Sequence, residues 1–261
     1  MGIAVDDYNQ DGLVDLFVTN FYKESNTLYV QQTGGLFHDG TRQAGLRQSG
    51  FNLLGFGTQF LDAQLDGHPD LVVANGHIDD FTYQDIPFQM PPQFLTNRQG
   101  TYQERGAEAG PYFRRKLLGR GLAAADLDRD GKADFVVSHL DAPVAVLTNT
   151  TIQTGNYLAI QLRSTSGQRD AIGATVTLVV GGDKPRKLVR QLTAGDGYQA
   201  SNQRQFLIGV GSEQQVDQLQ VKWPSGHVDN YRGLSVNRQW MLIESDPSPH
   251  LLPVTSTGLE R

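Results

Sequence analysis

The chain has 261 residues, of which 38% are hydrophobic and 19% charged, and it contains 29 glycines but no cysteine. The lack of cysteine excludes disulfides, zinc–thiolate sites, iron–sulfur clusters and cysteine nucleophiles. Residues 1–150 carry a net charge of −8, whereas residues 151–261 carry a net charge of +2. Because nucleic-acid binding depends on clustered Lys and Arg, the acidic first half disfavours nucleic acid and favours a cation as partner.

The first predicted element is a pair of short strands joined by an acidic loop at residues 7–15. Its pattern, Asp-x-(Asp/Asn)-x-Asp-Gly-x-x-Asp, recurs at residues 126–134, and a copy at residues 62–70 has Gln64 at its third position. We call these segments the first, third and middle acidic loops. Their candidate metal ligands are Asp7, Asn9, Asp11, Asp15, Asp62, Asp66, Asp70, Asp126, Asp128, Asp130 and Asp134.

The similarity extends beyond the loops. Residues 53–57 match residues 117–121 at an offset of 64, and residues 35–39 match residues 100–104 at an offset of 65. Fixed-period self-similarity of short apolar strands between Gly and Asp turns is typical of β-propeller blades. The loops start 55 and 64 residues apart, more than the roughly 40–50 residues of a usual blade, and we assign the excess to insertions, notably residues 77–92.

Three acidic loops predict about three four-stranded blades, whereas a propeller has about four to eight. The first unit begins in the middle of a motif at Met1. We therefore expect the C-terminal part of a longer propeller, with a signal peptide in the missing part and a location outside the cell, on its surface or in the periplasm. No apolar run is long enough to predict a membrane span.

The acidic loops have the ligand pattern of a calcium site. Calcium takes six to eight oxygen ligands, and glycine at position six permits the sharp turn that aims positions one, three and five inward. An EF-hand would place Glu at position twelve, where this chain has Val18 and Val137, so we expect position nine to supply the closing carboxylate. The sequence thus predicts Ca²⁺ as cofactor, bound more weakly by the middle loop.

Asp, Asn and Gly also favour tight turns without any metal. This alternative stays open, above all for the middle loop. In the first and third loops, however, four oxygen-bearing side chains at equal spacing would repel one another without a cation.

The second half, residues 151–244, predicts a small β-sandwich. Its strands are expected at residues 157–162, 174–180, 187–192 and 218–223, with the two tryptophans, Trp223 and Trp240, in core or inter-sheet packing. Residues 245–261 are polar and contain proline, so we expect a disordered tail.

Residues 1–150 resemble the FG-GAP/VCBS repeats of integrin-like β-propellers through Gly-x-Gly followed by the acidic loop. Residues 156–244 resemble the ASPIC/UnbV domain that follows such repeats in the cartilage acidic protein 1 family. The matching segments are residues 156–158 (Asn-Tyr-Leu), 172–174 (Ile-Gly-Ala), 195–198 (Gly-Asp-Gly-Tyr), 208–211 (Ile-Gly-Val-Gly, usually Phe-Gly-Leu-Gly) and 221–226 (Val-Lys-Trp-Pro-Ser-Gly). The resemblance implies an exported calcium-binding protein used for adhesion or recognition, without catalytic residues.

The sequence has no nucleophile elbow, zinc-protease helix or phosphate-binding loop. Residues 119–124 formally fit a dinucleotide fingerprint, but they lead into an acidic turn instead of a helix. His77 with Asp79 and Asp80 is the one cluster that suggests acid–base or metal chemistry, although a solvated loop is the simpler interpretation.

We therefore predict an all-β chain with a partial β-propeller at residues 1–150, a sandwich-like domain at 151–244 and a tail at 245–261. The predicted function is a calcium-binding extracellular scaffold for protein or glycan partners, not an enzyme. Two alternatives stay open: a biosynthetic accessory or enzymatic protein, like some UnbV-type relatives, with its active groups in missing blades or around His77; and purely structural loops with no partner.

Overall fold

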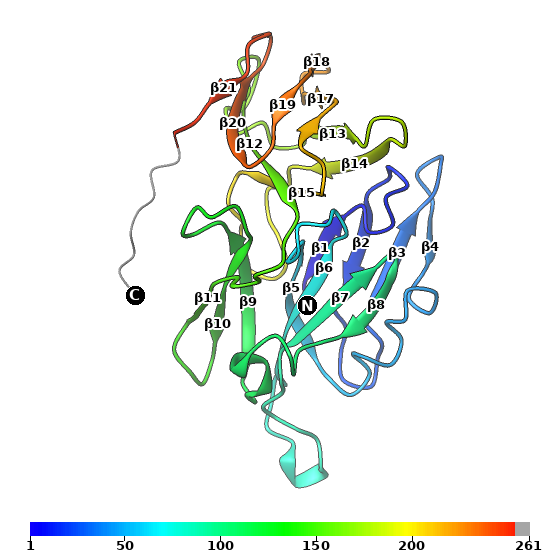
Figure 1. The fold of residues 1–261 in the computed structure, drawn as a ribbon. Coiled ribbons are helices and arrows are strands. Elements are labelled where there is room, and N and C mark those ends of the chain that lie inside the picture. Colours follow the sequence, from blue (N-terminus) through cyan, green and yellow to red (C-terminus); the bar gives the residue numbers. More distant parts are fainter. Residues whose placement is uncertain (254–261) are drawn as a thin grey trace.

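A computed structural model describes residues 1–253, and its regular structure is almost entirely β-strand (Figure 1). Helix within this range is limited to two short 3-10 turns, η1 (Thr82–Gln84) and η2 (Pro111–Arg114). The predicted all-β fold is confirmed. No helix in the described part of the chain has the length and apolar character needed to cross a membrane.

The first half forms three small antiparallel sheets, each with its strands in chain order. The first contains β1 (Ile3–Asp6), β2 (Asp15–Val18), β3 (Thr27–Gln31) and β4 (Phe37–Asp39). The second contains β5 (Gly55–Leu61), β6 (Asp70–Asn75), β7 (Gln93–Arg98) and β8 (Thr101–Glu104). The third contains β9 (Gly119–Ala125), β10 (Asp134–His139) and β11 (Ala145–Leu147).

The sheets stack face to face as propeller blades do, and β6 shows how. Successive residues of a strand point to opposite faces of its sheet, so Leu71 and Val73 pack into a core shared with the first blade. Val72 and Ala74 point the other way into a core shared with the third blade. Because both faces are covered, every residue of β6 is buried. This explains why its sequence is a continuous apolar run and not an alternating one.

The sequence repeat corresponds to structural repetition. Residues 53–57 and 117–121 lead into the equivalent strands β5 and β9, and residues 35–39 and 100–104 contain the equivalent fourth strands β4 and β8. One expectation is wrong, because the third blade has three strands and not four. After β11 the chain leaves this blade and enters the second half of the fold.

The second half is a β-sandwich of two four-stranded sheets. One sheet has the order β15 (Phe206–Gly211), β12 (Asn156–Arg163), β20 (Arg238–Ile243), β21 (His250–Leu251). The other has the order β14 (Arg186–Gln191), β13 (Thr175–Val180), β17 (Gln218–Lys222), β18 (Val228–Tyr231). A short pair, β16 (Gln215–Val216) and β19 (Leu234–Ser235), closes one end. Trp223 is buried in the shared core and Trp240 packs partly buried against it, as the sequence predicts.

The segment expected to be a disordered tail begins with ordered structure. β21 pairs antiparallel with β20, aligning Leu251 with Trp240. Backbone pairing along the sheet edge therefore outweighs the polar, proline-containing composition of residues 245–253. Residues 254–261, which complete the predicted tail, lie outside the described part of the chain.

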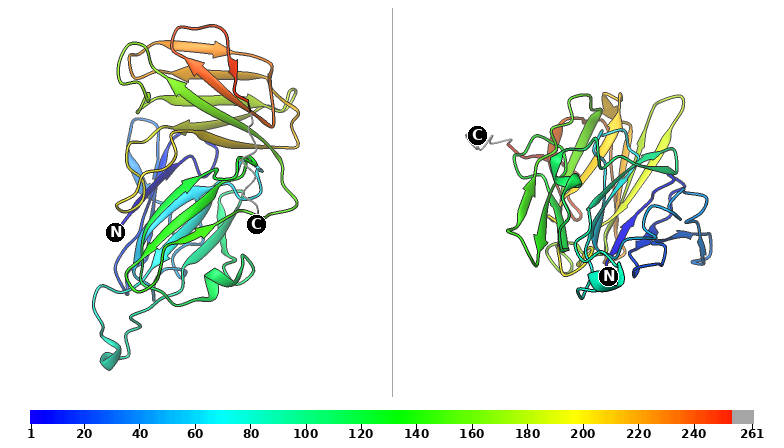
Figure 2. Two further views of the ribbon diagram at one scale, coloured as in Figure 1. Left: turned by 90° about the vertical axis from the view of Figure 1, so that its left-hand side faces the viewer. Right: turned by 90° about the horizontal axis from the view of Figure 1, so that it is seen from below.

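The sandwich lies across one end of the blades, and the insertion after β6 projects from the opposite end (Figure 2). The contact includes a backbone bridge in which Ile3 and Gly197 exchange hydrogen bonds of 3.1 and 2.9 Å. The acidic loops join β1 to β2, β5 to β6 and β9 to β10. They lie at the end of the blades that faces the sandwich.

Candidate metal sites at the domain junction

The three acidic loops share one backbone conformation. Their fourth residues, Gln10, Leu65 and Arg129, have left-handed φ angles of 62°, 58° and 62°. Their sixth residues are glycines with φ angles between 85° and 93°, a region where any side chain would be strained. The glycine of the motif is therefore required by backbone geometry in all three copies, including the middle loop with its altered third position.

The position-nine aspartates hold each loop against the neighbouring strands. Their Oδ2 atoms accept the N–H of the second loop residue at 3.2 Å for Asp15, 3.1 Å for Asp70 and 2.9 Å for Asp134. Their Oδ1 atoms accept N–H groups of Gln31, Asn97 and Asn149 at 2.9, 2.7 and 2.8 Å. An ionised carboxylate has about four lone-pair positions, so these bonds leave capacity for a cation.

The position-one aspartates differ in one bond. In the first and middle loops, Asp7 and Asp62 accept two backbone N–H groups, one on each carboxylate oxygen, from the fifth and sixth loop residues. In the third loop, Asp126 Oδ2 accepts the Gly131 N–H at 3.2 Å, but the buried Oδ1 has no hydrogen-bond partner. A buried carboxylate oxygen without a partner is costly, so this atom needs a donor or a cation.

The third loop also brings its carboxylates together. Oxygens of Asp126, Asp128 and Asp130 lie within 4.8 Å of one another. Two oxygens that bind one calcium ion at 2.3–2.6 Å lie at most about 5 Å apart, so this cluster fits such an ion. Burial, reinforced by the neighbouring carboxylates, raises the pKa of Asp126 to about 6. The Lys132 ammonium, 2.8 Å from Asp130 Oδ2, partly offsets the negative charge.

The first loop is held by its own hydrogen bonds. Asn9 Nδ2 donates to Asp11 Oδ2 at 3.0 Å, and Asn9 Oδ1 accepts the Asp11 N–H at 3.0 Å. Burial raises the pKa of Asp7 to about 6 and that of Asp15 to about 7. A cation here would require Asn9 to present its amide oxygen in place of its nitrogen, a rotation of one exposed side chain.

The middle loop is enclosed much as the first is, where Asp7 and Asp15 are both 0% exposed. Asp62 is 7% exposed and Asp70 is 1% exposed, and burial raises their pKa values to about 7 and about 8. Gln64, the residue that breaks the motif, accepts the Gly155 N–H on its backbone oxygen at 2.8 Å. The second half of the chain therefore contacts this loop directly.

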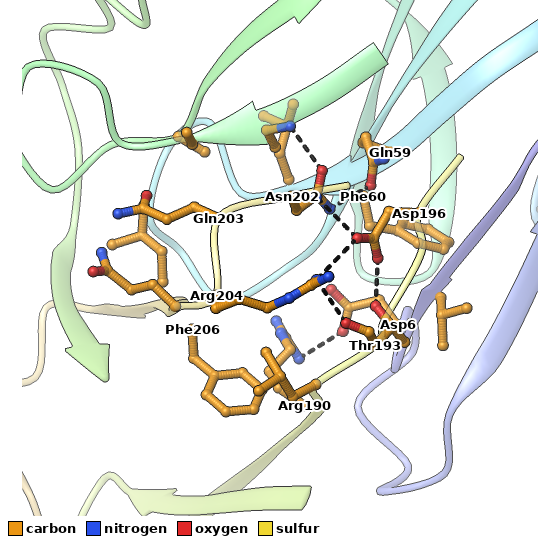
Figure 3. A pocket seen from close by; sticks show the side chains of 18 of the residues that line it. Asp6, Gln59, Phe60, Arg190, Thr193, Asp196, Asn202, Gln203, Arg204 and Phe206 are labelled. Carbon is orange, nitrogen blue, oxygen red and sulfur yellow. Dashed lines mark hydrogen bonds and ion pairs between the residues drawn. The ribbon is translucent and has the colours of Figure 1, made fainter. Parts of the chain in front are cut away.

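A cavity of about 150 Å³ lies beside the loops, between the blades and the sandwich (Figure 3). Four of its charged groups form two ion pairs: Arg190 Nη1 is 3.0 Å from Asp6 Oδ1, and Arg204 Nη1 is 3.8 Å from Asp196 Oδ2. Asn202 donates to Gln59 Oε1 at 2.8 Å and accepts the N–H of a β9 residue. The Asp6–Arg190 pair and the bonds of Asn202 thus join the two halves of the fold, whereas Asp196 and Arg204 both belong to the second half.

The His77 cluster predicted from sequence does not assemble. His77 is 2% exposed and its ring is surrounded by the edges of Phe21, Tyr22 and Phe81. Its Nδ1 lies 2.9 Å from the backbone oxygen and 3.3 Å from the backbone nitrogen of Asp79. The histidine therefore anchors the insertion to the blades, while Asp79 and Asp80 are exposed, as expected for a solvated loop.

Comparison with known proteins supports both motif assignments. Residues 7–73 match the family model of an FG-GAP-like repeat, and residues 164–249 match the model named ASPIC and UnbV. The chain contains an FG-GAP-like repeat followed by an ASPIC/UnbV domain. The resemblance drawn from the acidic loops and the Trp-Pro-Ser-Gly region is thereby confirmed.

The chain is also similar to cartilage acidic protein 1 over most of its length. It is 23% identical to the human protein and 24% identical to the mouse protein, each over 228 residues that cover 86% of this chain. It spans only about a third of these curated relatives, 33% and 34% of their lengths. A Bacteroides ovatus structure provisionally described as a cell adhesion protein is 9% identical over 96% of this chain and 93% of its own, but its TM-score of 0.19 carries no argument.

Sequence reasoning missed the residues that the second half contributes to the loops. Arg186 and Arg190 on β14, and Gly209 on β15, all contact the middle loop. The alternation of β14 could have indicated which of its side chains point inward. Nothing in a single sequence indicates that the facing surface is an acidic loop.

Proposed function

We propose that the chain is part of a calcium-stabilised β-propeller scaffold that works outside the cell by binding a protein or glycan partner. The observation that supports this most directly is the third acidic loop, where oxygens of three carboxylates lie within 4.8 Å of one another and one of these carboxylates, Asp126, has a buried oxygen without a partner. A calcium ion would satisfy that oxygen and offset the repulsion among Asp126, Asp128 and Asp130.

An extracellular location suits sites of this kind. Short loops with three or four carboxylates and no rigid helical frame resemble extracellular modules, whose dissociation constants are about 10⁻⁴–10⁻³ M. Such sites fill only where calcium is abundant. The similarity to cartilage acidic protein 1 supports the same location.

The proposed role is binding and not catalysis. Four of the charged side chains that line the junction cavity, Asp6, Arg190, Asp196 and Arg204, form two ion pairs, and the other two, Asp62 and Asp126, belong to the acidic loops. The bound ions would fix the turns of the blades, and rigid blades would in turn position their outer loops for a partner.

Calcium binding can be tested by calorimetry and thermal melting of the whole chain after removal of metal with EDTA. We expect saturable binding near 10⁻⁴–10⁻³ M or tighter, with a raised melting temperature. Asp130→Asn should lower both effects, whereas Asp183→Asn, at an exposed aspartate outside the loops, should change neither. No heat and no thermal shift in the wild type would contradict the proposal.

The partner can be sought by probing arrays of extracellular-matrix proteins and glycans in calcium and in EDTA. We expect binding that is retained in calcium and lost in EDTA or in the Asp130→Asn variant. Binding of equal strength in both buffers would contradict a role for calcium in recognition, and absence of binding to either class would contradict the scaffold role.

A further inference from the structure

The middle acidic loop is covered by the backbone of β15. A Cβ atom added at Gly209 would lie 2.1 Å from Asp62 Oδ2 and 2.4 Å from the Leu65 carbonyl carbon. Gly211 donates its N–H to the Leu65 oxygen at 2.9 Å. The Gly-x-Gly segment of β15 is therefore shaped to lie against this loop, because any side chain at Gly209 would prevent the approach.

Two arginines of β14 complete the contact. Arg186 Nη1 donates to the Asp66 backbone oxygen at 3.1 Å, while its Nη2 donates to the Val210 oxygen at 2.9 Å. Arg190 Nη2 donates to the Gly67 oxygen at 3.4 Å, and its Nη1 forms the ion pair with Asp6. Each guanidinium thus links the loop to a second group, the Val210 oxygen for Arg186 and the Asp6 carboxylate for Arg190. The planar arrangement of its N–H donors allows two such contacts at once.

The positive charge at this loop is buried and fixed. Arg190 is only 9% exposed, so its charge is weakly screened by solvent. A calcium ion added beside Asp62 and Asp66 would meet two guanidinium groups that cannot move without breaking the junction. The third loop differs, since its positive charge comes from Lys132 within the loop, whose side chain is 18% exposed and whose partner Asp130 is 34% exposed.

We infer that the middle acidic loop is a docking site of the ASPIC/UnbV domain on the propeller, with Arg186 and Arg190 supplying the positive charge that a calcium ion would otherwise provide. The third loop also contacts this domain, through the Asp126 N–H that donates to Gln203 Oε1 at 2.9 Å. The middle loop keeps the calcium-loop backbone but uses it to bind its own C-terminal domain. This inference rests on the proposed function only for its contrast with the first and third loops. The docking itself requires no metal.

The docking can be tested by hydrogen exchange of the whole chain in EDTA. The Gly155 and Gly211 amides report directly, because both donate to backbone oxygens of the middle loop. We expect exchange at both amides to be faster by roughly tenfold or more in Arg186→Gln, the factor for one lost hydrogen bond from a charged group. Arg186→Lys should show part of the same change, because one ammonium nitrogen would replace the two guanidinium nitrogens that donate to the Asp66 and Val210 oxygens.

Gly209→Ala changes the β15 side of the same interface. It should accelerate hydrogen exchange at the same two amides. Arg169→Gln, whose side chain is 76% exposed, is the matched control and should leave them unchanged. Wild-type exchange at Gly155 and Gly211 in both Arg186→Gln and Gly209→Ala would overturn the inference.

Calcium titration separates this inference from the proposed function. We expect Asp66→Asn to bind as many calcium ions as the wild type, because Arg186 and Arg190 already supply positive charge at the middle loop. Loss of one ion in Asp66→Asn would overturn the inference and leave the calcium proposal standing. A wild type that binds no calcium would contradict the proposed function, while the exchange experiment in EDTA would still decide the docking.

Discussion

The third and middle acidic loops share a backbone conformation and the same hydrogen bonds at position nine, yet they face different surroundings. The third loop has clustered carboxylates, an unpartnered Asp126 oxygen and an ion pair of its own Lys132 with Asp130. The middle loop is covered by β15 and fixed by two arginines. The difference shows that the motif determines the turn, whereas the positive charge beside it comes from the loop's own Lys132 in the third loop and from the second half of the chain in the middle loop.

The strongest way to break this comparison is to remove the buried charge at the middle loop. In the ion pair of Arg190 with Asp6, both side chains are 11% exposed. Arg190→Ala would leave Asp6 buried and unpaired, which costs about 3–5 kcal/mol. We expect that loss in the free energy of unfolding, measured by urea denaturation. Arg169→Ala, at an exposed position, should cost about 0–1 kcal/mol, and equal costs for the two variants would contradict the role given to Arg190.

The close approach of β15 gives a second test. Gly209→Ala forces a methyl group into the Asp62 carboxylate and should destabilise the chain by about 1–3 kcal/mol, the usual cost of overpacking. Gly195 is a matched control, since a Cβ there meets no atom within 4 Å. Gly195→Ala should therefore be neutral in the same denaturation experiment. Tolerance of Gly209→Ala would show that the contact with the middle loop is loose.

Glu244 provides a contrast to the acidic loops, because protein hydrogen-bond donors surround its carboxylate and no cation is needed. Burial would raise its pKa, but hydrogen bonds from Ser164, Ser225, Ser166 and Thr165 outweigh this and lower it from 4.5 to about 2. Because the folded-state pKa is depressed, its stabilisation is present above pH 4.5 and is lost as the pH falls toward 2. Glu244→Gln should lose about 1–2 kcal/mol at pH 7.

The same variant should flatten the decline of stability across that pH window, which acid titration of the unfolding transition would reveal. If stability declined with falling pH as steeply in Glu244→Gln as in the wild type, the acid sensitivity would come from other carboxylates.

The smallest expected effect concerns Lys132. Its ion pair with Asp130, whose two side chains are 18% and 34% exposed, is worth about 0–1 kcal/mol, and a calcium ion bound to Asp130 would displace it. Lys132→Gln should therefore tighten calcium binding by up to about fivefold in calorimetry. Weaker binding in Lys132→Gln would show that the lysine supports the third loop and does not compete with the ion.

The blades could be predicted from sequence because the chain repeats itself. The acidic loops indicated the turns, the offset of 64 aligned β5 with β9, and the apolar run after Asp70 indicated a strand. Four strands of the two sandwich sheets, β12, β13, β14 and β17, followed from partial alternation, whereas β15, β18, β20 and β21 were not predicted. The third blade's missing strand could not be predicted, because nothing local marks where residues 148–155 leave one sheet for another fold.

Only the carboxylates of the candidate site could be predicted from the sequence, and not the residues that contact them from the second half of the chain. The carboxylates could be found because each loop contains its own ligands within nine residues. Arg186, Arg190 and Gly209 reach the middle loop from more than a hundred residues away in the chain. Such long-range contacts depend on how the two halves of the fold dock. The residue pattern of a single sequence does not predict that docking.

The most direct test of this account is to count the calcium ions bound to the intact chain, by native mass spectrometry at saturating calcium. We predict two ions, one in the first loop and one in the third, with Asp130→Asn losing one of them and Asp66→Asn losing none. Three ions, with one lost in Asp66→Asn, would contradict the assignment of the middle loop to domain docking. No bound ion would contradict the calcium-stabilised propeller itself.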